Sequence, residues 1–121
     1  MLPFWILAAL VVKHFLCDFP LQTKYMREGK TPYLADGGIH HAFFHGIVTA
    51  MVFVAFGMHQ FAGTLAVLDT LVHYHVDYFK ARLTSHFKLT TENHAFWQLL
   101  GGDQMIHHLT YVGLVALAFN A

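Results

Sequence analysis

Histidine and aspartate recur at a four-residue spacing along this chain. Because an α-helix has 3.6 residues per turn, two side chains four residues apart lie on the same helix face. The sequence contains 11 histidines, and four separate segments hold a pair of imidazole or carboxylate groups at this spacing. The pairs are His14 with Asp18, His41 with His45, His73 with Asp77, and Asp103 with His107.

These side chains have the chemistry of a metal centre. Neutral imidazole and ionised carboxylate both bind divalent metals, and the charge of the metal offsets that of the carboxylates. Cys17 is the only cysteine, which argues against a structural zinc site made of thiolates. We therefore expect one or two catalytic divalent ions, with zinc as the first candidate and manganese or iron as alternatives. The predicted metal ligands are His14, Asp18, His41, His45, His73, Asp77, Asp103 and His107.

Three polar residues follow the predicted ligands closely in the sequence. They are Gln22, Lys80 and Gln104, and we expect them to bind substrate. Lys80 together with Arg82 would suit a phosphate group, whereas a lysine near a membrane surface also commonly reaches lipid headgroups. Asp18 and Asp77 are the predicted catalytic residues, because either would act as a general base wherever it is not a metal ligand.

The composition predicts that membrane-crossing helices position these groups. Hydrophobic residues make up 56% of the chain and charged residues 12%, which is about half the charged share of a soluble domain. Four apolar runs have the length of about 20 residues that a helix needs to cross a bilayer. They lie near residues 2–22, 39–60, 62–80 and 97–119. The predicted fold is all-α, one domain over residues 1–121 that forms an integral-membrane four-helix antiparallel bundle.

The distribution of cations predicts the orientation of this bundle. All basic residues except Lys13 fall in or beside two connections that share one face of the membrane, and the positive-inside rule makes that face cytoplasmic. Both termini would then lie outside. Lys13 stands within the first apolar run, where a cleavable signal peptide would be apolar, so we expect a retained helix.

The position of each polar pair along its run predicts where the pairs meet. The pairs lie late in the first and third runs and early in the second and fourth. An antiparallel bundle therefore brings all four pairs to one depth, in the cytoplasmic half. Ionisable side chains within lipid face the bundle interior and are functional by default. A hydrogen-bonded network without metal is the structural alternative.

Three classes of function fit this pattern. The first is a metal-dependent hydrolase that acts on an amphiphilic phosphate at the cytoplasmic leaflet. The metal would lower the pKa of a bound water to about 7, and this water would attack the substrate. The second is a di-iron or haem membrane oxidoreductase, and the third is a non-enzymatic protein that transports protons or metal ions. Residues 50–56 and 112–119 carry no ionisable group, which disfavours transport, so the hydrolase is the primary expectation.

The charge balance also bears on partners. Seven basic residues balance seven acidic ones, so the chain has no strongly basic surface for nucleic acid. Membrane lipids are the expected surroundings. Gly46 with Gly57, and Gly101 with Gly102, would allow close helix contacts within one chain or between chains, so a homo-oligomer is an open alternative.

The motifs taken together resemble a known family. They are His14-Phe15-Leu16-Cys17-Asp18-Phe19-Pro20-Leu21-Gln22, His41-x3-His45, His73-x3-Asp77-x2-Lys80 and Asp103-Gln104-x2-His107, over about residues 12 to 112. In this order they are similar to the small membrane proteins of bacteria and phages in domain-of-unknown-function family 3307. The resemblance implies a multi-pass protein of the bacterial inner membrane, with Lys30 as its loop lysine. It implies no established activity.

Overall fold

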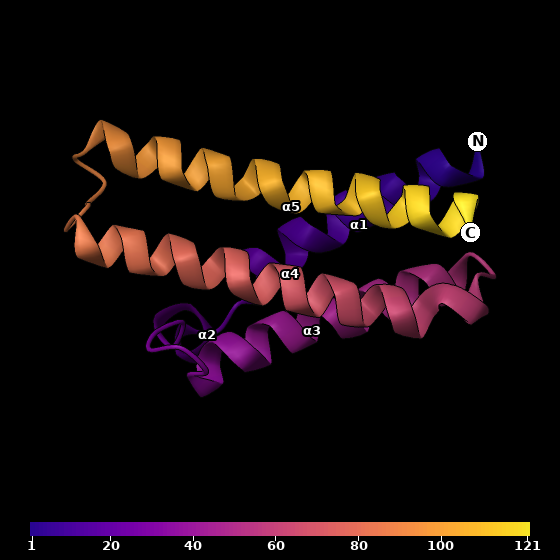
Figure 1. The fold of residues 1–121 in the computed structure, drawn as a ribbon, viewed down its shortest axis with the longest axis horizontal. Coiled ribbons are helices and arrows are strands. Elements are labelled where there is room, and N and C mark those ends of the chain that lie inside the picture. The colour runs from indigo at the N-terminus through magenta and orange to yellow at the C-terminus, as the bar shows by residue number, and fades with distance from the viewer.

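The computed structural model describes residues 1–121 and is all-α, which confirms this part of the predicted fold class (Figure 1). Four of the five helices are long, and one is a short helix of 5 residues. The helices are α1 (Leu2–Asp18), α2 (Lys24–Glu28), α3 (Asp36–Ala55), α4 (His59–His86) and α5 (His94–Asn120).

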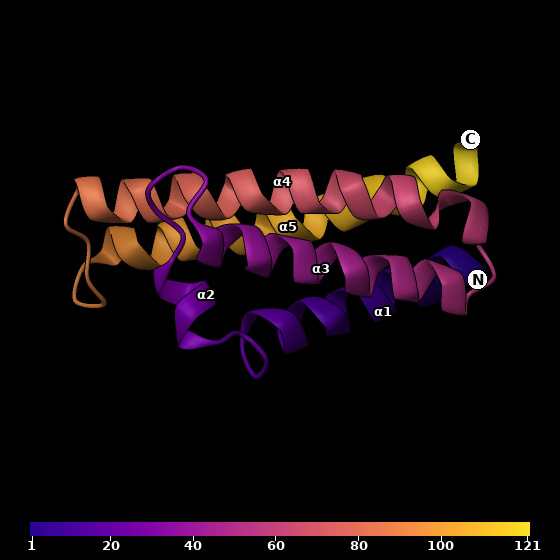
Figure 2. The same cartoon turned by 90° about the horizontal axis from the view of Figure 1, so that it is seen from below.

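The four long helices lie side by side around a shared interior. α3 packs against α1 and α4, and α5 packs against the same two helices. The backbones of α1 and α4 do not approach each other closely, so these helices face each other diagonally across the interior. Both termini lie at one end of the molecule, and the connection between α4 and α5 lies at the other (Figure 1). Figure 2 shows α2 within the connection from α1 to α3.

α1 ends earlier than the first apolar run predicts. Pro20 follows Phe19 and has no backbone N–H group, so it cannot donate the next hydrogen bond of the helix. Asp18 is therefore the last helical residue. Gln22 lies outside the helix, although the first apolar run, near residues 2–22, includes it. Its side-chain amide instead donates a hydrogen bond to the backbone carbonyl of Asp18.

The other helix ends also differ from the apolar runs. α3 ends at Ala55, shortly before Gly57, whose positive φ of 80° suits glycine at a helix end. α4 continues beyond residue 80 to His86, and α5 begins at His94. The short helix α2 was not predicted. An apolar pattern marks only the part of a helix that suits lipid, so it misses polar turns that continue the helix.

Gly46 allows a close contact between α3 and α4. A Cβ atom added at Gly46 would lie 2.9 Å from the backbone carbonyl oxygen of Ala66, which is closer than such atoms approach. A Cβ atom added at Gly63, on α4, would meet nothing within 4 Å. The spacing of the two helices therefore depends on the absence of a side chain at Gly46.

The interior has an apolar half and a polar half. The apolar half lies at the end of the molecule where both chain termini lie. It consists of Ile6, Leu10, Phe53, Ala62, Leu65, Tyr111, Leu114, Val115 and Ala118. Over the whole molecule, buried polar and charged residues are as many as buried hydrophobic ones. Large hydrophobic side chains are instead mostly exposed, among them Phe4, Phe43 and Leu109. Charged residues are rarely fully buried unless they are paired, so the buried polar residues are the unusual feature of this interior.

One helix, α3, is long and apolar enough to cross a membrane by length and composition alone. α1 has 17 residues, and α4 and α5 carry polar residues along one face. The helices at the other three predicted spans therefore do not meet this criterion of length and apolar composition.

We expect Gly46→Ala to lower the free energy of unfolding by about 1–3 kcal/mol, because the new methyl group must push α3 from α4. Gly63→Ala is the matched control and should change it by less than about 1 kcal/mol. Thermal unfolding of the detergent-purified variants measures both. Equal effects of the two substitutions would contradict the close contact.

Candidate metal centre

The polar half of the interior holds all eight side chains that the sequence predicts as metal ligands. Each of them is at most 8% exposed. They come from α1, α3, α4 and α5, so the four helices contribute to one cluster. Their roles as ligands or catalytic groups stay predictions.

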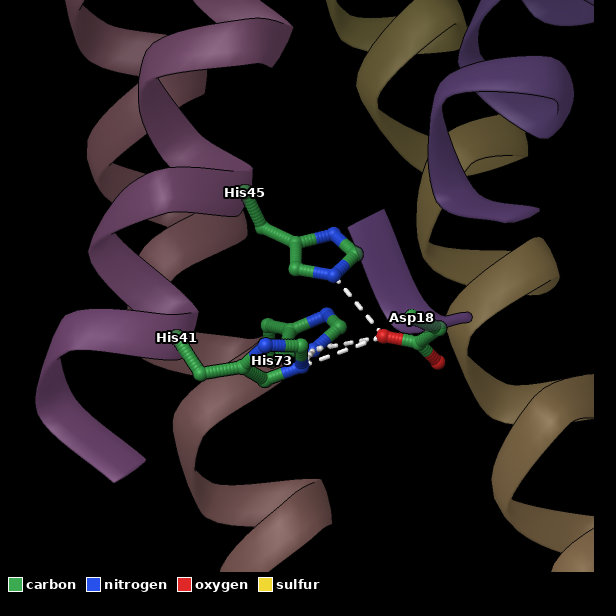
Figure 3. Close-up of side chains that lie close together, drawn as sticks. All are labelled: Asp18, His41, His45 and His73. Atoms are coloured by element: carbon green, nitrogen blue, oxygen red, sulfur yellow. Dashed lines mark hydrogen bonds and ion pairs between the residues drawn. The ribbon is translucent and has the colours of Figure 1, made fainter. Parts of the chain in front are cut away.

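Asp18 stands at the centre of this cluster. Three imidazoles converge on its Oδ1 atom (Figure 3). The Nε2 atoms of His45, His41 and His73 lie 2.8, 3.1 and 3.7 Å from that oxygen. The other carboxylate oxygen, Oδ2, lies 3.1 Å from Nε2 of His14. Four imidazoles therefore surround a single carboxylate.

The distances between these atoms suit a metal ion. The Nε2 atoms of His41 and His73 face each other at 3.2 Å. The ligand atoms of Asp18, His41, His45 and His73 all lie within 4.8 Å of one another. A tetrahedral zinc ion with bonds of about 2.0–2.1 Å would separate its ligand atoms by about 3.3 Å. This group of side chains could therefore hold an ion after small adjustments.

A second group shares His73 with the first. It consists of His73, Asp77 and His107, whose ligand atoms also lie within 4.8 Å of one another. Asp77 Oδ1 lies 3.1 Å from His107 Nε2, and Asp77 Oδ2 lies 3.4 Å from His73 Nε2. Because the two groups share the single lone pair of His73 Nε2, they could hold one ion at either of two neighbouring positions.

His14 and Asp103 belong to neither group, although the sequence predicts both as ligands. Nδ1 of His14 lies 2.8 Å from the hydroxyl oxygen of Tyr111, and its Nε2 lies 2.9 Å from Oε1 of Gln104. Asp103 Oδ1 lies 3.4 Å from Nε2 of His107. Both residues are therefore placed to orient candidate ligands, because His14 contacts Asp18 and Asp103 contacts His107.

Lysines neutralise all but one of the buried carboxylates. Lys13 pairs with Asp69 at 2.9 Å, Lys80 pairs with Asp103 at 3.1 Å, and Lys30 pairs with Asp77. Asp18 has no lysine partner and contacts only imidazoles and amides. The uncompensated negative charge of the interior is therefore located where the imidazoles converge.

Lys13 is a buried residue that the sequence analysis did not place in the cluster. Its ammonium group donates to Asp69, to the carbonyl oxygen of His45 at 3.2 Å, and to Nδ1 of His45 at 3.1 Å. An ammonium group has only hydrogens to offer, so Nδ1 of His45 is the acceptor. The remaining ring hydrogen is then on Nε2, which donates to Asp18. Asp69 precedes His73 by four residues, which places both on one helix face, but no sequence pattern indicates that Lys13 is its partner.

Lys30 reaches the cluster from the connection between α2 and α3. The amide of Gly38 donates to the carbonyl oxygen of Gly29 at 2.7 Å. A Cβ atom on Gly37 would lie 2.8 Å from the Cα atom of Gly29, so the two backbone segments touch without side chains between them. This contact holds Lys30, 7% exposed, in the interior beside Asp77.

A cavity of about 620 Å³ opens beside Asp18. All three predicted substrate-binding residues, Gln22, Lys80 and Gln104, line this cavity. The amide of Gln104 also donates to Asp18 Oδ2 at 3.3 Å, so the cavity and the cluster are adjacent. Arg82, which the sequence paired with Lys80, is exposed and does not line the cavity. The helix carries these two side chains in different directions because they are two residues apart.

We expect Lys13→Met to lower the free energy of unfolding by about 3–5 kcal/mol, because it leaves Asp69 buried without its partner. A double variant with Asp69→Leu should recover most of this loss, since it removes the unpaired charge. Lys24→Met, at an exposed lysine without an ion pair, is the control. Unfolding in detergent measures all three, and a mild Lys13→Met effect equal to that of Lys24→Met would contradict the buried pair.

The comparisons with known proteins agree with the resemblance seen in the motifs. No curated protein and no solved structure matches the chain. The model of a family described as "Protein of unknown function (DUF3307)" matches residues 6–120, a range that includes every candidate ligand. The chain therefore belongs to the DUF3307 family of proteins of unknown function.

Proposed function

We propose that this protein is a metal-dependent membrane hydrolase that acts on an amphiphilic substrate at the cytoplasmic leaflet. The observation that carries the proposal is the environment of Asp18, the one buried carboxylate without a lysine, which four imidazoles surround. A divalent cation would compensate this charge and use the imidazoles in their neutral form. Zinc is the first candidate because the donors are nitrogen and oxygen and the spacing suits a tetrahedral site.

Asp18, His41 and His73 are the proposed core ligands. Nδ1 of His41 and Nδ1 of His73 are buried and have no partner, so no other contact commits these two rings to one tautomer. His45 would join them only after its Nε2 hydrogen leaves, because Lys13 occupies its Nδ1 atom. A metal held here supplies a Lewis acid and makes a bound water more acidic.

Asp77 is the proposed general base. Its Oδ2 atom lies 3.3 Å from Nε2 of His41 and 3.4 Å from Nε2 of His73, so it lies next to the core ligands. Lys30 holds the carboxylate in this position. A carboxylate fixed beside the metal can accept a proton from a reacting water.

The two halves of the interior favour an enzyme over a transport protein. The cavity lies on one side of Asp18, and it is lined by residues near the ends of α1, α2, α4 and α5. On the other side, Phe53, Leu65 and Tyr111 belong to the apolar cluster that fills the space between the helices. A path for protons or ions would have to pass through this cluster, which has no ionisable carboxylate or imidazole.

The proposed location in the bacterial inner membrane is supported by the surface of the molecule. Exposed hydrophobic side chains occur on all four long helices, among them Val12, Phe43, Val67 and Leu109. Contact of these side chains with water costs free energy, whereas contact with lipid does not. The cations around the cavity would lie at the cytoplasmic face, where anionic lipids are found.

Metal analysis of the detergent-purified protein tests the proposed centre. The wild type should hold at least one divalent ion per chain, and His41→Ala or His73→Ala should lose it, because each removes a core ligand. Asp18→Asn keeps the shape of the side chain but removes the charge, and should weaken binding by about tenfold or more. His59→Ala and His86→Ala, at exposed ends of α4, are the controls and should retain the ion.

Equal metal content in all of these variants would contradict the proposal. A wild type that binds none of the three tested ions, zinc, manganese and iron, would also contradict it. In that case an imidazolium among the four rings, and not a metal, compensates the charge of Asp18.

The topology is tested separately with reporter fusions in bacterial cells. Fusions after Tyr33 and after Thr90 should report the cytoplasm, because both follow clusters of cations, and a fusion at Ala121 should report the outside. A cytoplasmic Ala121 would contradict the proposed orientation.

A further inference from the structure

The cavity beside Asp18 has a strongly positive lining. It lies where the end of α1 and the helix α2 meet the last turns of α4 and the first half of α5. Its lining includes four cations and one carboxylate, Asp18. The cations are Arg27, Lys30, Lys80 and Lys88. The charge of this lining therefore favours an anionic occupant.

Two of the four cations are free to bind it. Lys30 pairs with Asp77 and Lys80 pairs with Asp103, so their charges are compensated within the protein. Arg27, on α2, and Lys88, just after α4, have no ion pair. Two different elements thus present one free positive charge each to the same cavity.

The cavity also offers groups for the rest of a ligand. The side-chain oxygen Oε1 of Gln22 is buried and has no hydrogen-bond partner, so it is free to accept from a hydroxyl group of an occupant. Phe19, Phe96 and Leu100 supply an apolar part of the lining. An amphiphile with an anionic head would contact both kinds of surface.

We propose that this cavity binds a phosphomonoester group, with Arg27 and Lys88 as its charge partners. Such a group carries a charge of about −1.5 to −2 at neutral pH, which matches two free cations, and its three terminal oxygens suit the paired donors of arginine. The inference rests on the proposed function, whose substrate class it names. Asp18 and Gln104 line the cavity and also contact the imidazoles, so the phosphate would lie next to the metal centre.

The test is a binding titration of the full chain in detergent with three probes. Dioctanoyl phosphatidic acid carries the phosphomonoester, dioctanoyl phosphatidylglycerol is a matched lipid with a singly charged diester, and inorganic phosphate has no lipid part. We expect phosphatidic acid to bind about tenfold or more tightly than phosphatidylglycerol, because a second charge-assisted contact forms. If inorganic phosphate binds as tightly as phosphatidic acid, free phosphate and not lipid is the source of the group, and the site stands.

Substitutions of the two free cations make the test specific. Arg27→Gln and Lys88→Gln should each weaken phosphatidic acid binding by about tenfold, whereas Arg27→Lys should retain part of the affinity. Lys24→Gln on α2 and Arg82→Gln on α4 are matched controls, since neither residue lines the cavity. Equal affinity for the two lipids, or equal effects of the cavity and control variants, would overturn the proposal.

The same samples separate this inference from the proposed function. Metal content is measured beside each titration, in the presence of zinc and after chelation. Loss of phosphomonoester selectivity in a protein that holds its metal would overturn the inference alone. Selective binding by a wild type that holds no metal would overturn the proposed hydrolase and leave the phosphate site in place.

Discussion

The buried charge of Asp18 is the constraint on which the rest of the structure depends. A carboxylate within an apolar environment costs several kcal/mol unless a positive charge accompanies it. The other three buried carboxylates each have a lysine, and Asp18 has only imidazoles and amides around it. One further cation, either a metal or a proton shared among the rings, would offset this charge.

The architecture serves to bring those charges together. Diagonal helices α1 and α4 meet only through side chains, and the contact of Lys13 with Asp69 is one such meeting. Gly46 permits α3 to lie close to α4, and the contact of Gly29 with Gly37 holds Lys30 inside. The apolar cluster fills the interior at the end with the termini, and the cavity beside α2 lies next to Asp18. The outward hydrophobic surface then suits lipid as the solvent of the bundle.

Sequence spacing predicted the convergent histidines and aspartates because a four-residue repeat defines a helix face without knowledge of the partner helix. His41, His45, His73 and Asp77 illustrate this, since all four lie in the interior. Spacing could not predict pairs between helices, such as Lys13 with Asp69, because these depend on helix rotation and on contacts far apart in the chain. The ends of α1 and α4 were also missed, because local effects of Pro20 and of polar turns do not change the apolar pattern.

The most direct test of the metal centre is X-ray absorption spectroscopy of the purified, metal-loaded protein at the edge of the bound metal. With Asp18, His41 and His73 as ligands, a zinc ion should have nitrogen and oxygen neighbours at about 2.0–2.1 Å, with the outer-shell scattering of at least two imidazole rings. The imidazole signal should fall in His41→Ala and His73→Ala and remain in His59→Ala. A bound ion surrounded by oxygen alone, or an imidazole signal unchanged in all three variants, would contradict the centre described here.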